Sequence, residues 1–140
     1  MKKITLIFVI VSTLFIQETK AQVTDTLAYL QNIVANKAQY VGQPFSVLYN
    51  NLQIQLKFFT PFGAVHYDKN KETSTSFAFY YPQSVNDHYL SYPRLEIYWQ
   101  TPLNAGQSTV LWKNNNWGEW NTAAYNFYKN AIIVDIQVIE

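Results

Sequence analysis

The sequence contains no cysteine. This absence excludes disulfide bonds, thiolate metal ligands, a cysteine nucleophile and a lipid-modified N-terminal cysteine. Only two histidines are present, His66 and His88, and neither has a close metal-ligand spacing to the scattered carboxylates. The four glycines are dispersed along the chain and make no phosphate-binding loop. We therefore expect no metal, no cofactor and no catalytic residues.

Charge is also scarce, because Asp, Glu, Lys and Arg make up 14% of the chain and its formal net charge is +1. Without an excess of basic residues, the chain lacks the electrostatic signature of a nucleic-acid-binding protein. Hydrophobic residues make up 49% and aromatic residues 17% of the sequence, a composition that excludes an intrinsically disordered chain. A length of 140 residues favours a single domain.

No apolar run is long enough to span a membrane, but a shorter one stands near the N-terminus. Met1 is followed by two lysines, a mainly apolar run over 4–16 and a polar segment that ends in Ala21. This order is typical of a secretory signal peptide, whereas a retained membrane anchor would need about 20 apolar residues. We predict a signal peptide over 1–21, a single domain over 22–140 without a membrane span, and a periplasmic or extracellular location.

Two helices are predicted at the start of the mature chain. Thr24 or Asp25 can cap the first, and hydrophobic residues at three- and four-residue spacing extend it to about Ala38. The same spacing over 45–52 predicts a second, shorter helix. The sequence is compatible with either a further helix or a hairpin over 119–131.

The hydrophobic period changes to two after residue 52, as is typical of half-buried strands. Strands are predicted over 53–58, 76–81, 94–99 and 132–138, with an additional one over 108–112. One polar face per strand favours antiparallel pairing. We therefore predict an α+β fold in which N-terminal helices pack on an antiparallel sheet of about four to five strands.

The same patterns predict which residues are buried and which are not. The polar stretch 68–76 is expected to form a mobile loop. The expected core takes one residue from each of six segments: Leu30, Leu48, Leu56, Phe79, Ile97 and Val134.

One pair of side chains has the composition of part of a hydrolytic site. His66 and Asp68 would lie on one side of an extended segment, as a general base and the acid that orients it do. No nucleophile is tied to the pair. A small hydrolase using His66 and Asp68 is therefore an alternative function, and a structural accessory subunit of an envelope complex is another.

The aromatic residues are the most unusual feature of the chain. Several of them gather with asparagines near the C-terminal third, namely Trp112, Trp117, Trp120, Tyr125 and Tyr128 with Asn114, Asn115, Asn116 and Asn121. Flat rings beside amides can hold a sugar, and the same rings can fill the core of a small domain. Runs of asparagine favour surface loops. We predict that Trp117, Asn115 and Asn116 contact a protein or glycan partner, and that the domain is non-catalytic.

Two patterns resemble those of known proteins. The segment ending Lys20-Ala21-Gln22 resembles signal peptides of exported Bacteroidota proteins, and Asp25-Thr26-Leu27 resembles the short O-glycosylation motif of that phylum, which implies a glycan on Thr26. The segment Tyr40–Leu48 resembles small uncharacterised exported proteins of the same bacteria. The expected order of elements is similar to envelope domains of the β-lactamase-inhibitor and outer-membrane-assembly-lipoprotein type, although the lipid-acceptor cysteine is missing. The resemblance implies action in the cell envelope or outside the cell.

Overall fold

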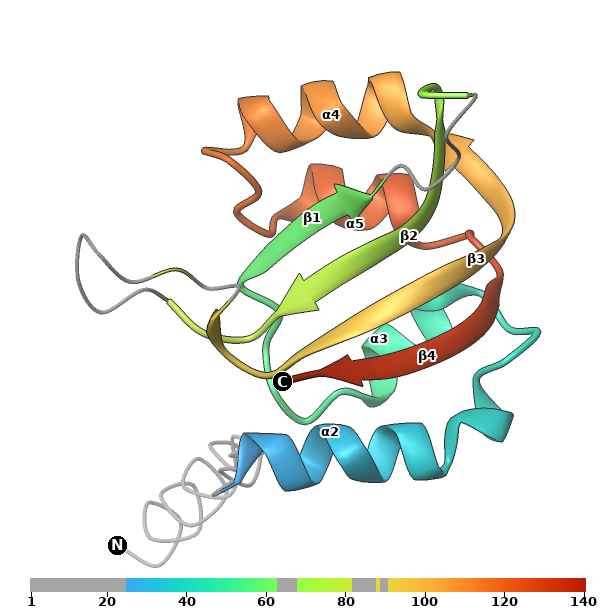
Figure 1. The fold of residues 1–140 in the computed structure, drawn as a ribbon, viewed down its shortest axis with the longest axis vertical. Helices are drawn as coiled ribbons and strands as arrows, with labels where there is room; N and C mark the ends of the chain where they lie inside the picture. Colours follow the sequence, from blue (N-terminus) through green and yellow to red (C-terminus); the bar gives the residue numbers. More distant parts are fainter. Residues whose placement is uncertain (1–24, 63–67, 82–87, 89–90) are drawn as a thin grey trace, which may run out of the picture.

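The computed structural model describes residues 25–62, 68–81, 88 and 91–140 (Figure 1). The predicted signal peptide over 1–21 lies outside these residues, as does His66. The described residues form one antiparallel sheet with helices packed against it, which confirms the predicted α+β fold.

The sheet has four strands in chain order: β1 (Phe58–Phe62), β2 (Lys71–Ala78), β3 (Arg94–Asn104) and β4 (Ile133–Ile139). Each neighbouring pair is antiparallel. In β3, Leu95, Ile97 and Trp99 are buried at every second position, as their alternation predicts.

Helices precede the sheet and also interrupt it. The 3-10 helix η2 (Lys37–Gln39) follows α2 (Thr26–Ala35), and α3 (Phe45–Asn51) leads towards β1. The chain then forms α4 (Ala105–Asn114) and α5 (Thr122–Tyr128) between β3 and β4. Figure 1 shows α3 and α5 behind the sheet, α2 beside β4, and α4 on the β1 side. The helices are therefore not all N-terminal, and the segment 119–131 contains a helix and not a hairpin.

The expected strand over 108–112 is wrong, because this segment belongs to α4. The Asn104 side chain caps the helix by accepting a hydrogen bond from the Gln107 backbone N–H at 2.9 Å. Ser108, Leu111 and Trp112 then turn towards the core at helical spacing. The cap and this packing override the preference of Thr109, Val110 and Trp112 for strands.

The expected mobile loop over 68–76 is also wrong, because β2 begins at Lys71. β2 lies between two other strands, so its backbone groups are paired on both sides. Its polar side chains Glu72 and Thr75 are fully buried and hydrogen-bonded inside the protein. The polar composition of this segment therefore led to the prediction of a loop where the structure has an interior strand.

The predicted strand over 53–58 is displaced towards the C-terminus. Phe58 pairs with Ala78, the last residue of β2, so the preceding residues have no further strand residue to pair with. The strand consequently buries Phe59, which is 0% exposed, and leaves Phe58 only partly buried.

The core contains five of the six residues that the sequence placed there, namely Leu30, Leu48, Leu56, Phe79 and Ile97. The sixth, Val134, is wrong, since 49% of it is exposed. Tyr98 pairs with Asp135 while Trp99 pairs with Ile133, so a bulge at Val134 interrupts the alternation of β4. The bulge shifts the alternation for the residues that precede it, so Ile133 is buried in place of Val134, while Ile136 is buried as the alternation predicts.

Candidate functional site

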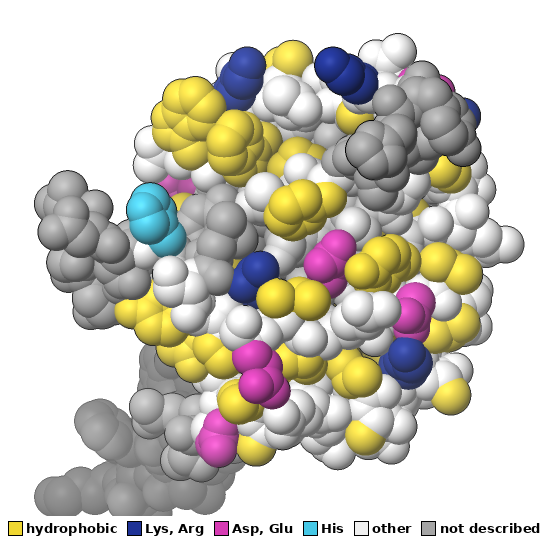
Figure 2. Space-filling model, viewed as in Figure 1, with side chains coloured by type: hydrophobic (Ala, Val, Ile, Leu, Met, Phe, Trp, Pro, Cys, Tyr) yellow, Lys and Arg dark blue, Asp and Glu magenta, His cyan; other side chains and the backbone are white. Residues whose placement is uncertain are grey.

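The three residues predicted to contact a partner lie in the turn that joins α4 to α5. Asn116, Trp117 and Gly118 all have positive φ, at 49°, 61° and 102°. Trp117 is 58% exposed, and its ring packs edge-on against Trp112 with centroids 5.0 Å apart. In Figure 2, hydrophobic side chains gather over the end of α4 that leads into this turn. We call residues 115–118 the tryptophan turn.

The tryptophan turn is tied to the body of the protein by backbone hydrogen bonds. Gly118 N–H donates to the Trp112 carbonyl at 2.9 Å, and Phe59 N–H donates to the Gly118 carbonyl at 2.8 Å. The second bond joins the turn to β1. The position of Trp117 is therefore set by the sheet and not by the loop alone.

The two asparagines of the predicted set have different surroundings. The Asn115 side chain donates to Asn121 Oδ1 at 3.0 Å, which links the turn to the cap of α5. Asn116 is exposed beside Trp117. The structure thus leaves Trp117 and Asn116 open to solvent, while Asn115 supports the turn.

Gly118→Ala is expected to lower the free energy of unfolding by more than Gly42→Ala. Both glycines have positive φ, 102° and 80°, and alanine in such a conformation costs about 1–3 kcal/mol. At Gly118 the added Cβ would also lie 2.4 Å from the Phe59 carbonyl oxygen, whereas nothing lies within 4 Å of a Cβ at Gly42. Urea unfolding of the two variants measures the difference. Equal losses would contradict the close approach of the tryptophan turn to β1.

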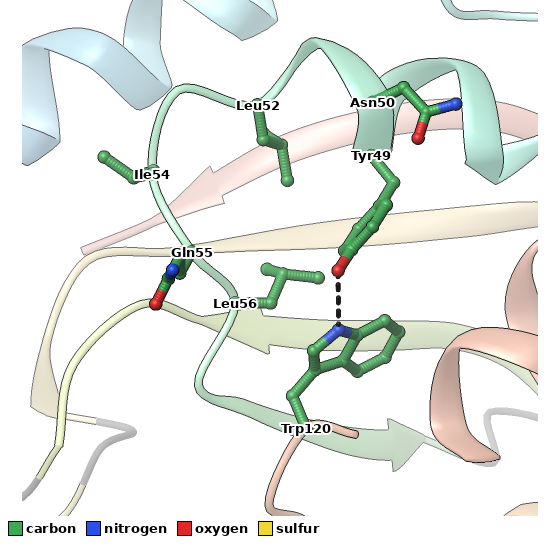
Figure 3. A pocket seen from close by; sticks show the side chains of 7 residues that line it. All are labelled: Tyr49, Asn50, Leu52, Ile54, Gln55, Leu56 and Trp120. Carbon is green, nitrogen blue, oxygen red and sulfur yellow. Dashed lines mark hydrogen bonds between the residues drawn. The ribbon is translucent and has the colours of Figure 1, made fainter. Parts of the chain in front are cut away.

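A groove lies beside the tryptophan turn, where α3 and the following segment meet Trp120. One hollow of about 380 Å³ is lined by Tyr49, Asn50, Leu52, Ile54, Gln55, Leu56 and Trp120 (Figure 3). A second hollow of about 260 Å³ is lined by Tyr49, Trp120, Asn121, Thr122 and Tyr125. Because both hollows share Tyr49 and Trp120, we describe them together as the aromatic groove.

Trp120 connects the aromatic groove to the core. Its ring packs edge-on against Phe59 and Phe77, with centroids 5.9 Å and 5.6 Å away. Its indole N–H faces the Tyr49 hydroxyl at 3.4 Å, as Figure 3 shows. The sequence left open whether Trp120 fills the core or contacts a ligand. The sequence did not predict the contact between Tyr49 and Trp120, because the two residues are 71 positions apart and no local pattern relates them.

A buried polar cluster lies between the sheet and the two C-terminal helices. Glu72 is 0% exposed, and its Oε1 accepts hydrogen bonds from the Thr75 hydroxyl and from the Tyr128 hydroxyl at 3.0 Å. The Trp99 indole N–H donates to Thr75 Oγ1 at 2.9 Å. Ser108 of α4 is buried beside Glu72. Sequence reasoning missed this cluster because Glu72 lies in the stretch expected to be a loop.

Burial governs the acid–base properties of this cluster. It raises the pKa of Glu72, and the surrounding hydrogen-bond donors oppose that shift without cancelling it. Burial, followed by the neighbouring Glu72, raises the pKa of Tyr128 well above its usual value. The hydrogen bond between Glu72 and Tyr128 joins β2 to α5. Because both side chains are 0% exposed, the cluster offers no surface for a substrate.

The pair considered for hydrolysis is only half described. His66 lies outside the described residues, whereas Asp68 lies just before β2. The Asp68 carboxylate accepts a hydrogen bond from Asn70 N–H at 3.0 Å and contacts Lys71 Nζ at 3.3 Å. The hydrogen bond from Asn70 is the larger cause that lowers the pKa of Asp68, and the contact with Lys71 lowers it further. Asp68 therefore takes part in a local turn.

The predicted O-glycosylation residue, Thr26, is the first residue of α2 and is partly exposed. Asp25 caps this helix by accepting a hydrogen bond from Ala28 N–H at 3.0 Å, which confirms one of the two predicted caps. The cap accounts for the aspartate by itself, and glycosylation of Thr26 stays a prediction.

No protein-family model, curated protein or solved structure shows significant similarity to this chain. Within the described part of the chain, no helix combines the length and apolar character needed to cross a bilayer. Among the same residues, no three His, Cys, Asp or Glu side chains gather closely enough to hold a metal ion.

Proposed function

We propose that this protein is an exported, non-catalytic domain that binds a protein or glycan partner in the cell envelope or outside the cell. The contact set is Trp117 and Asn116, with Asn115 holding their turn in place. The signal-peptide pattern over 1–21 supports export.

The observation that carries the proposal is the exposure of Trp117 on a turn anchored to the sheet. The Trp117 side chain is 58% exposed. Its backbone lies in a left-handed conformation, which favours glycine and asparagine over tryptophan. Tryptophan is enriched among the residues that dominate binding energy at interfaces. A ring held by Trp112 and by the backbone loses little conformational freedom on binding, which favours affinity.

The placement of three acidic side chains supports the non-catalytic part of the proposal. Glu72 is buried, Asp68 contacts Lys71, and Asp135 contacts Lys37. A hydrolase using His66 and Asp68 and a structural accessory subunit both stay as alternatives. Within the described residues, neither has an observation that favours it over binding at the tryptophan turn.

Trp117→Ala is expected to abolish capture of the partner from an envelope extract of the native organism, while lowering the free energy of unfolding by only about 1 kcal/mol. The small cost reflects loss of one aromatic contact, with Trp112. Capture by the wild type, by Trp117→Ala and by a control variant is compared by mass spectrometry, and their stability is compared by urea unfolding.

Val110→Ala is the matched control, because Val110 is also 58% exposed. It lies on α4 and should leave capture unchanged. Equal capture by the wild type and Trp117→Ala would refute the assignment of the binding residues.

A further inference from the structure

We propose that the aromatic groove is a second binding site, separate from the tryptophan turn, and that it holds a neutral oligosaccharide. Tyr49, Trp120 and Tyr125 would contact the apolar C–H faces of the sugar rings, and the amides around them would bind the hydroxyl groups. The inference does not depend on the function proposed for Trp117.

The aromatic rings of the groove pack against one another and against the core. Tyr49 lies 5.8 Å from Trp120 and 4.8 Å from Tyr125, measured between ring centroids. Trp120 is in turn held by the buried rings of Phe59 and Phe77. Because these contacts already hold the rings in position, little conformational entropy would be lost when a ligand binds.

Two buried leucines line the first hollow. Leu52 and Leu56 are 5% and 7% exposed, and Figure 3 shows Leu56 pointing towards the facing ends of Tyr49 and Trp120. The hollow of about 380 Å³ lies within the size range of small-ligand pockets, roughly 300–1,000 Å³. The first hollow is therefore of suitable size for a small ligand, and two leucines are among the residues that line it.

Amide side chains supply the polar part of the groove. Asn121 Oδ1 accepts from Ala124 N–H at 3.0 Å and from Asn115 at 3.0 Å, which fixes the orientation of its NH₂ group. Gln55 Oε1 accepts from Lys57 Nζ at 2.9 Å, which orients the Gln55 NH₂ group in the same way. Asn50 and Thr122 are exposed on the two hollows. Amides and hydroxyls both donate and accept, as sugar hydroxyls do.

The lining of the groove favours an uncharged ligand. None of the residues that line either hollow is charged. The cation next to it, Lys57, bonds to Gln55 and lies 5.0 Å from the centre of the Tyr81 ring. An acidic polysaccharide would need a cation at the contact to offset loss of its hydration.

The polar groups also distinguish a sugar from a proline-rich peptide, another ligand that binds in aromatic-lined grooves. Proline rings have no hydrogen-bonding groups, and the carbonyls of such a peptide only accept hydrogen bonds. The groove presents acceptors as well as donors, through Asn50 and Thr122. A sugar can use both kinds of group.

The test is isothermal titration calorimetry of the purified protein with neutral hexasaccharides of glucose, mannose, xylose and N-acetylglucosamine. Oligogalacturonate and a proline decamer are titrated as the charged and peptide probes. At least one neutral hexasaccharide is expected to bind, and Tyr125→Ala is expected to weaken its affinity about tenfold or more.

Trp117→Ala is the matched control, since it removes an aromatic ring from the other candidate site and should leave saccharide affinity unchanged. Circular dichroism and melting temperature establish that Tyr125→Ala is folded, and Tyr125→Phe, which keeps the ring, should retain most of the affinity. Failure of every neutral hexasaccharide at millimolar concentration, binding that Tyr125→Ala leaves intact, or binding only of oligogalacturonate or polyproline would each overturn the proposal. None of these results would bear on partner capture through Trp117.

Discussion

Trp99→Ala is expected to lower the free energy of unfolding by about 3–5 kcal/mol, the usual cost of truncating a buried tryptophan. Trp99 is 4% exposed, and its ring stacks on Tyr128 with centroids 5.7 Å apart. It also packs edge-on against Phe45 and Phe77. Truncation would leave a cavity where α3, α5 and the sheet meet. It would also remove the indole N–H that donates a hydrogen bond to Thr75 Oγ1.

Urea unfolding followed by circular dichroism measures this effect. The chemically identical change at Trp117, which is 58% exposed, serves as the control and should cost far less. Comparable losses in the two variants would show that Trp117 belongs to the core, and would remove the basis for a binding surface at the tryptophan turn.

Glu72→Ala is expected to destabilise the protein through its hydrogen bonds. The Thr75 and Tyr128 hydroxyls, both fully buried, would lose their shared acceptor. A buried polar group left unsatisfied costs about 1–3 kcal/mol, and the cavity adds to that loss. Glu72→Gln keeps an oxygen for both donors and is expected to cost much less.

Glu72 is also expected to make the stability depend on pH. Burial raises the pKa of Glu72 in the folded state above the usual 4.5. Well below pH 4.5 its carboxyl group is therefore protonated in both states, and its contribution to stability is fully present. As the pH rises, the unfolded chain releases the proton first. The contribution of Glu72 to stability therefore decreases with rising pH until the pH exceeds the folded-state pKa. The free energy of unfolding should therefore fall as the pH rises above 4.5.

Urea unfolding over pH 4.5–8 tests this dependence. Glu72→Gln, which cannot titrate, should flatten the slope, whereas Glu140→Gln at an exposed carboxylate should keep it. Asp68 and Asp135 have lowered pKa values and act in the opposite direction, but only as the pH falls below about their usual 3.8. An unchanged slope in Glu72→Gln would mean that folding does not raise the pKa of Glu72.

The sequence by itself determined the elements that have a regular pattern and a local start signal. Asp25 and the three- and four-residue spacing after it predicted α2, because a helix cap and an amphipathic face are both local features. Alternation predicted the buried face of β3 at Leu95, Ile97 and Trp99. The asparagine run likewise predicted an exposed position for Trp117, which the structure has.

Tertiary structure decided the features that depend on a partner far along the chain. Glu72 became an interior residue because Tyr128, 56 positions away, and Thr75 satisfy its carboxyl group. Val134 became exposed because pairing with β3 placed a bulge there. Tyr49 joined Trp120 because α3 packs where the chain returns after the tryptophan turn. Periodicity reports which side of one element avoids water, but which groups meet across the core is set by packing between elements.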